Sequence, residues 1–281
     1  MRVRRIAIAI LAGVSLSAQE PLGPAQNGDF YSLEKEAALG KQLAADVRRR
    51  TIPIDSPIIQ NYLDRVGQKI GAYIPEAKFP FTFSVIADDP CRTIHEPTAL
   101  PGGYVFVPAG LFVAAQEEDE FAGMLAHAME HVAQRHGTRQ ATRGTTATIP
   151  LIFIGGWAGG CSGGQAIPVA FLASQRSAEL EADVLAVQTM ARAGFDPNAL
   201  VRYVERVQVQ PTGTMSKSYS PIPDRDERIA ALLATIEKLP KIDYTVAPPD
   251  EFATARQELR RLTEQPLRSG APPSLMRKKQ E

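Results

Sequence analysis

Residues 124–137 read MLAHAMEHVAQRHG, and this stretch holds three of the four histidines of the chain. Its composition is helical throughout. At about 100° per residue, His127 and His131 point within about 40° of each other, so both imidazoles share one face of the predicted helix. A separate apolar stripe runs beside them, made of Phe121, Leu125, Ala128 and Val132. The stretch therefore predicts a metal-ligand helix; an isolated pair of this spacing would also suit a helix surface.

The letters between the two histidines bear on the chemistry. The stretch resembles the HExxH helix of zinc peptidases, in which two His bind Zn and the Glu after the first His is the general base. Here that position is Ala128, and the one carboxylate inside the motif is Glu130. Peptidase chemistry would then need Glu130 as its base. His136 lies on another face, and we expect it to pack or cap, with Gly137 ending the helix.

Composition excludes some classes of function. The chain has 31 basic and 31 acidic residues, so it carries no electrostatic footprint for nucleic acid. Residues 1–18 combine a basic start with a short apolar run that ends in small residues, which predicts a signal peptide and export; an uncleaved anchor is the alternative. In an oxidising compartment Cys91 and Cys161 could pair, and the sequence leaves open whether they meet.

The order of periodicities predicts a mainly helical α+β fold, in which a small sheet precedes the metal helix. We expect a linker over 19–29, a domain over 30–240, a C-terminal helical extension over 241–264 and a disordered tail over 265–281. Strands are expected at 81–86 and 104–107. Helices are expected at 32–50, 57–73, from about 117–120 to 137, and at 173–193, 198–207, 225–238 and 251–263.

A catalytic zinc needs a third protein donor besides the histidine pair. Glu179 is the best candidate, because Glu179 and Asp183 are four residues apart on one predicted helix face. Glu179 would bind the metal, and Asp183 would orient a ligand imidazole from behind. Without the histidine pair, two such carboxylates would more often form a solvated face.

Several further motifs accompany this pattern. They are ALPGGY at 99–104, VAQRH at 132–136, Arg176 with Glu179, Ala182 and Asp183, and AGFDP at 193–197. Together they resemble the gluzincin metallopeptidases that include the CAAX prenyl endopeptidases, the membrane protease HtpX and the periplasmic protease-chaperone BepA. The resemblance covers most of the chain after residue 18. It implies one Zn²⁺ held by His127, His131 and Glu179, with Asp183 behind them.

The resemblance also implies a protein or peptide substrate in extended conformation, bound along the strand after the PGG turn. Relatives carry Glu where this chain has Ala128. They often carry a His-Pro pair where this chain has Tyr219 and Ser220, so Tyr219 could donate to an oxyanion or be a plain surface residue. Residues 149–172 are apolar and glycine-rich, and they could form a flap, a peripheral membrane contact or a buried loop.

Two functions follow. The first is a periplasmic or secreted zinc metalloendopeptidase that acts on envelope or misfolded proteins, with Glu130 as its base. The second is a pseudo-peptidase, which keeps the metal and serves as a chaperone or scaffold because position 128 is Ala. A purely structural protein without a metal is a third possibility, and convergent donors argue against it.

Overall fold

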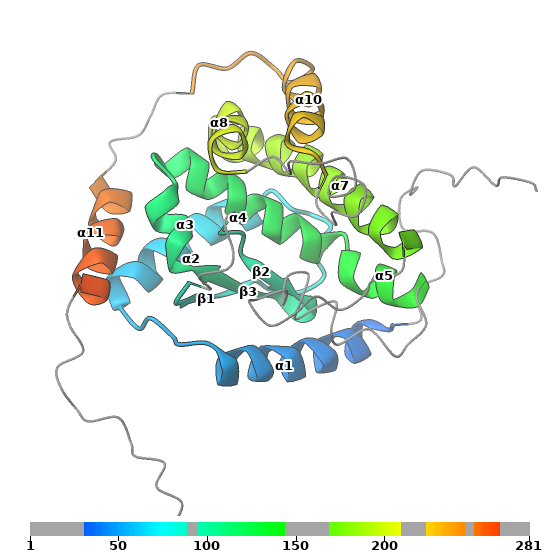
Figure 1. Cartoon of the computed structure of the whole chain (residues 1–281), viewed down its shortest axis with the longest axis horizontal. Helices are drawn as coiled ribbons and strands as arrows, with labels where there is room; N and C mark the ends of the chain where they lie inside the picture. Colours follow the sequence, from blue (N-terminus) through cyan, green and yellow to red (C-terminus); the bar gives the residue numbers. More distant parts are fainter. Residues whose placement is uncertain (1–30, 89–94, 144–168, 209–222, 245–249, 265–281) are drawn as a thin grey trace, which may run out of the picture.

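The computed structural model describes residues 31–88, 95–143, 169–208, 223–244 and 250–264 (Figure 1). The predicted signal peptide, Cys91, Cys161, the glycine-rich segment up to residue 168, Tyr219 and the C-terminal tail lie outside these ranges. Among the described residues, no helix combines the length and the apolar character that crossing a membrane requires.

The fold is mainly helical with a small sheet, as predicted, and the sheet has a third strand that was not expected. The strands are β1 (Thr82–Ile86), β2 (Thr98–Leu100) and β3 (Tyr104–Pro108), and a short 3-10 helix η1 (Pro101–Gly103) joins β2 to β3. The helices are α1 (Leu33–Arg50), α2 (Pro57–Gly71), α3 (Ala109–Ala114), α4 (Glu118–Ala133), α5 (His136–Arg143), α7 (Val169–Ala193), α8 (Asn198–Val207), α10 (Arg225–Ile236) and α11 (Asp250–Glu264).

Local signals account for two of the helix ends. Ser32 caps α1 through its side chain, which accepts a hydrogen bond from the backbone N–H of Lys35 at 3.3 Å. Gly194 follows α7 with a φ of 78°, a conformation that favours glycine. The expected stop at Gly137 was wrong, since α4 ends at Ala133 and the chain turns at Arg135, whose φ is 55°. Gly137 lies inside the next helix, α5.

The sheet is buried on both faces. Val105 and Val107 of β3 point to the main core, whereas Phe106 points to a second cluster beneath α1, as the alternation of a strand requires. That second cluster consists of Leu43, Ala44, Val47, Ile86, Leu100 and Phe106. Figure 1 shows α1 on one side of the sheet and α4, α7, α8 and α10 on the other.

β3 is the middle strand, paired in parallel with β1 and antiparallel with β2. The expectation that a substrate strand adds to β3 was therefore wrong, because both edges of β3 are already hydrogen-bonded. β1 is bridged on its outer side through Pro53 and Ile86. β2 is the last strand in the order β1-β3-β2, and it also contacts α4.

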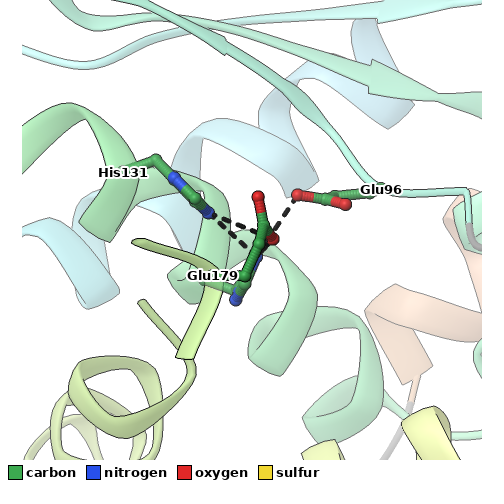
Figure 2. A group of neighbouring side chains, drawn as sticks. Glu96, His131 and Glu179 are labelled. Atoms are coloured by element: carbon green, nitrogen blue, oxygen red, sulfur yellow. Dashed lines mark hydrogen bonds and ion pairs between the residues drawn. The ribbon is translucent and has the colours of Figure 1, made fainter. Parts of the chain in front are cut away.

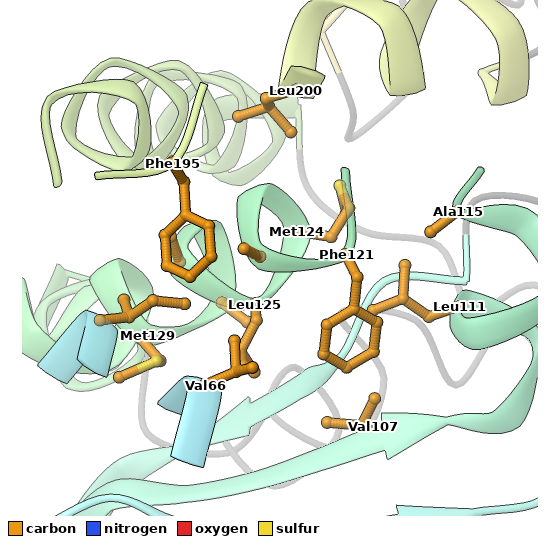
Figure 3. Packing of buried hydrophobic residues seen from close by; sticks show 14 of the residues in the cluster. Val66, Val107, Leu111, Ala115, Phe121, Met124, Leu125, Met129, Phe195 and Leu200 are labelled. Carbon is orange, nitrogen blue, oxygen red and sulfur yellow. The ribbon is translucent and has the colours of Figure 1, made fainter. Parts of the chain in front are cut away.

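Helix α4 passes through the middle of the main core. Nearly all of its residues from Glu120 to Glu130 are buried, and it packs along α7 and against α2 and α8. Figure 3 shows Phe121, Leu125 and Met129 of α4 packed among side chains from the neighbouring elements. The helix expected as a C-terminal extension, α11, contributes Phe252, Ala255 and Leu259 to the same core.

Helix α1 approaches η1 so closely that one position admits no side chain. A Cβ built on Gly40 would lie 1.8 Å from the carbonyl oxygen of Pro101. We therefore predict that Gly40→Ala lowers the free energy of unfolding by about 1–3 kcal/mol, the usual cost of overpacking. Chemical denaturation measures the change.

Gly71→Ala is the matched control, because a Cβ there would meet its nearest neighbours at 3.4 Å, an ordinary contact. Equal stability of the Gly40→Ala variant and the control would show that α1 does not rest on η1 as described.

Candidate metal centre

Helix α4 brings the two predicted histidine ligands together. The Nε2 atoms of His127 and His131 lie 3.1 Å apart, one helical turn from each other. Helix α7 lies alongside α4 and supplies Glu179, whose Oε2 is 3.4 Å from His127 Nε2 and 3.6 Å from His131 Nε2. His127 and Glu179 are buried, and His131 is partly exposed. The three residues expected to share a metal ion therefore converge on one point.

A fourth residue, which sequence reasoning missed, joins them. Glu96 precedes β2, and its Oε1 lies 3.2 Å from His127 Nε2 (Figure 2). One ligand atom from each of Glu96, His127, His131 and Glu179 lies within 4.8 Å of all the others. Nothing in the local sequence marks Glu96, because it stands outside any helix and belongs to no periodic pattern.

The ring of His127 is held from behind by a buried ion pair. Its Nδ1 lies 2.9 Å from Asp183 Oδ1, and Arg228 of α10 donates hydrogen bonds of 2.6 and 2.7 Å to the two oxygens of Asp183. Burial raises the pKa of Asp183, but the guanidinium of Arg228 outweighs this and holds the pKa below its usual value. An ionised Asp183 favours the His127 tautomer with its proton on Nδ1. The lone pair of Nε2 then faces Glu179 and Glu96.

The ring of His131 is held by a chain of two residues. Its Nδ1 lies 3.0 Å from His136 Nδ1, and His136 Nε2 lies 3.2 Å from Glu181 Oε2. Burial lowers the pKa of His136 to about 4, so the ring is neutral near pH 7. If His136 donates from Nε2 to Glu181, it accepts at Nδ1 from His131. The role expected for His136, packing or capping, is thus replaced by direct contact with a ligand ring.

These tautomers make the cluster a site for a cation. In these tautomers each histidine presents the lone pair of Nε2, and Glu179 and Glu96 present carboxylate oxygens beside them. Glu179 Oε2 is buried and accepts no hydrogen bond from the described part of the chain. A zinc ion with bonds of about 2.0–2.2 Å places tetrahedral ligands about 3.3–3.6 Å apart. The distances from Glu179 Oε2 to the two histidine nitrogens, 3.4 and 3.6 Å, agree with that geometry, and the 3.1 Å between the histidine nitrogens is slightly shorter.

The electrostatics of the pocket also favour positive charge. Burial alone would lower the pKa of His127, but Asp183, Glu179 and Glu96 raise it well above its usual value. Burial alone would raise the pKa of Glu179, but His131 and His127 lower it well below its usual value. A proton on His127 would stabilise only the contacts of that ring, whereas a divalent ion can be bound by ligand atoms of all four residues.

The remaining site residues lie elsewhere. Glu130 is buried, accepts a hydrogen bond of 2.7 Å from the hydroxyl of Thr189 on α7, and is not a member of the four-donor group. Burial raises the pKa of Glu130. Ala128 is fully buried in the main core. Tyr219 lies outside the described residues, so its role as an oxyanion donor stays a prediction.

Removal of Arg228 tests the support behind His127. Arg228→Met leaves the Asp183 carboxylate buried without its partner, which we expect to cost about 3–5 kcal/mol of unfolding free energy. Adding Asp183→Asn to this variant should restore part of the loss, because the unpaired charge disappears. Urea titration of the single and double variants measures both effects.

Arg49→Met is the control, since Arg49 forms an exposed pair with Asp46, and its loss should stay within about 0.5 kcal/mol. If Arg228→Met were as mild as Arg49→Met, Asp183 would not depend on Arg228 for its charge.

Known proteins are similar to this chain in sequence. The model of peptidase family M48 matches residues 58–236, which is more than half of the chain and includes all four donors. A beta-barrel assembly-enhancing protease of Vibrio cholerae is 33% identical over 193 residues, which cover 64% of this chain and 39% of that protein. The beta-barrel assembly-enhancing protease of Escherichia coli is 27% identical over 194 residues, with the same coverage.

Another relative comes from a eukaryote. The mitochondrial metalloendopeptidase OMA1 of Schizosaccharomyces pombe is 28% identical over 187 residues, covering 63% of this chain and 52% of that protein. The chain thus spans about two fifths of the length of the bacterial relatives and about half of the yeast relative. With its family match over 58–236, the chain belongs to peptidase family M48.

Proposed function

We propose that this chain is a zinc metalloendopeptidase-type protein that is exported to the periplasm or secreted and engages extended segments of envelope or misfolded proteins. The convergence of His127, His131 and Glu179 on one point carries the proposal. Zinc is the natural occupant, because imidazole nitrogens and a carboxylate are its usual donors in metallopeptidases. The basic and apolar start of the sequence, residues 1–18, supports export.

The residues around the centre have distinct tasks. When bound, zinc supplies a Lewis acid that polarises a carbonyl and activates water. Asp183 holds the proton of His127 on Nδ1, and His136 with Glu181 does the same for His131. The lone pairs of both Nε2 atoms can then bind the metal. The buried surroundings keep these hydrogen bonds strong.

The place of β2 in the sheet supports a protein substrate. β2 is the last strand in the order β1-β3-β2 and contacts α4, which carries both histidines, so an extended peptide bound beside β2 would lie next to the metal centre. Recognition through the backbone of an extended peptide depends little on the side chains of the substrate. It suits a protein that acts on many unfolded segments, and the names of the bacterial relatives indicate work on the assembly of β-barrel proteins.

A scaffold that binds protein segments without cleaving them is the second candidate function. Two observations favour it: position 128 is Ala, and Glu130, the carboxylate within the motif, is hydrogen-bonded to Thr189. A metallopeptidase needs a carboxylate beside the attacking water. The chain would then keep the metal to hold α4 against α7.

Metal content and cleavage, measured on one preparation, test the proposal. We expect one zinc per chain, lost in Glu179→Ala, and an affinity about 10- to 100-fold lower in Asp183→Asn, which removes the charge behind His127. Competition with a chromophoric chelator measures the affinity, and an unfolded reporter protein measures cleavage.

Zinc with cleavage of the reporter supports the peptidase, and zinc without cleavage supports the scaffold. A wild-type chain that binds no zinc, or a His127→Ala chain that binds it unchanged, would rule out the site.

The missing base gives a second test. Ala128→Glu restores the HExxH order, and a general base contributes about 10²- to 10⁴-fold to such a reaction, so we expect a gain of that order in peptide hydrolysis. Position 128 is buried, so circular dichroism must first show that the variant folds.

Glu130→Gln is the control, because Gln can still accept the hydrogen bond of Thr189. We expect Glu130→Gln to change neither the zinc affinity nor the rate of peptide hydrolysis, whether it is made in the wild-type chain or in the Ala128→Glu variant. Loss of activity in Glu130→Gln would identify Glu130 as the working base. A folded, zinc-loaded Ala128→Glu protein without cleavage would favour the scaffold.

A further inference from the structure

Glu96 occupies a position that neither the histidine motif nor the α7 carboxylates account for. Its side chain is nearly buried, with 10% of its surface exposed, and it points at the same spot as the side chains of His131 and Glu179 (Figure 2). It enters from the segment before β2, whereas the other three donors come from α4 and α7. A carboxylate is expensive to bury unless a cation or a set of hydrogen bonds stabilises it.

Hydrogen bonding to His127 cannot stabilise both carboxylates of the cluster. Glu96 Oε1 lies 3.2 Å from His127 Nε2, and Glu179 Oε2 lies 3.4 Å from the same nitrogen, so one ring nitrogen faces two carboxylates. The other ring nitrogen, Nδ1, lies 2.9 Å from Asp183 Oδ1. A divalent ion between Glu96 and Glu179 would stabilise both carboxylates at once. Arg228, the nearby guanidinium, is committed to Asp183 and to the side-chain oxygen of Gln208.

The distances place Glu96 among the ligands rather than behind them. Its separation from His127 Nε2, 3.2 Å, falls beside the 3.1 Å between the two histidine nitrogens and the 3.4 Å from His127 to Glu179. A tetrahedron around zinc has edges of about 3.3–3.6 Å, so the 3.4 Å separation falls within this range and the two shorter ones lie within about 0.2 Å of it. A carboxylate that only oriented a ligand would contact the far ring nitrogen, Nδ1, as Asp183 does.

The charges agree with this assignment. Two neutral imidazoles and two carboxylates balance the two positive charges of one divalent ion, and the compensated pair of Asp183 and Arg228 adds none. With Glu179 as the sole ligand carboxylate, the buried centre would carry one net positive charge beside an unpaired Glu96.

We propose that Glu96 is the fourth protein ligand of the metal, which makes the resting centre a closed site of two histidines and two glutamates. The inference rests on the metal site of the proposed function and adds to it. Closed four-ligand sites are typical of structural zinc, whereas catalytic zinc keeps one position open. Water or a substrate carbonyl can then reach the metal only after Glu96 leaves, and Glu96 can leave without moving α4 or α7.

The test uses the full chain loaded with Co²⁺ or Zn²⁺. We expect Glu96→Ala and the isosteric Glu96→Gln to bind one equivalent of metal with at least about 10-fold lower affinity than wild type, as loss of a ligand costs no less than loss of its support. Azide should alter the visible spectrum of the Co²⁺ form of Glu96→Ala, whose fourth position is open, and leave the wild-type spectrum unchanged. Glu117→Gln, an exposed glutamate paired with Arg202, is the matched control and should behave as wild type.

Each outcome bears on a separate claim. Wild-type affinity and an unchanged Co²⁺ spectrum in both Glu96 variants, together with loss of metal in His127→Ala, would overturn the role of Glu96 and leave the metal site standing. A wild-type spectrum that responds to azide as Glu96→Ala does would also overturn it. A wild-type chain that takes up no metal would remove both the site and the inference.

Discussion

Ligand atoms of Glu96, His127, His131 and Glu179 meet between α4, α7 and the segment before β2, all within 4.8 Å of one another. Two carboxylates gathered in so small and largely buried a space repel each other, so the arrangement favours a cation at its centre. The residues around the cluster strengthen the need for a cation. Asp183 and Arg228 on one side, and His136 and Glu181 on the other, occupy the outer ring nitrogens and so direct both lone pairs inward.

The rest of the fold serves to hold these elements together. α4 lies in the middle of the core, buried on nearly all sides, so its two histidines cannot move away from α7. α10 matters because it brings Arg228, the guanidinium that balances the buried charge of Asp183 behind His127. The sheet, covered by α1 on its far face, places β2 and therefore Glu96 beside the helix pair. The metal centre thus depends on the fold to bring together three distant parts of the chain, 95–100, 127–131 and 179–183.

Sequence alone predicted what is local. The histidine pair is a matter of helical spacing, and Ser32 and Gly194 mark helix ends through their own conformations, so neither needs tertiary information. Glu179 and Asp183 followed from spacing and from the family resemblance. Glu96 could not be found, because its place depends on how the loop before β2 meets α4. The partner of Glu130 was missed for the same reason, since Thr189 faces it only once α4 and α7 are packed. The turn at Arg135 likewise depends on a distant contact, the buried carboxylate of Glu36.

The central claim is that one metal ion sits among these donors, and anomalous diffraction from crystals of the zinc-loaded protein tests it most directly. The account predicts a single peak at the zinc edge, about 2.0–2.2 Å from His127 Nε2, His131 Nε2, Glu179 Oε2 and Glu96 Oε1. A fully loaded crystal whose zinc peak lies away from His127 and His131, or that shows no peak between α4 and α7, would contradict it.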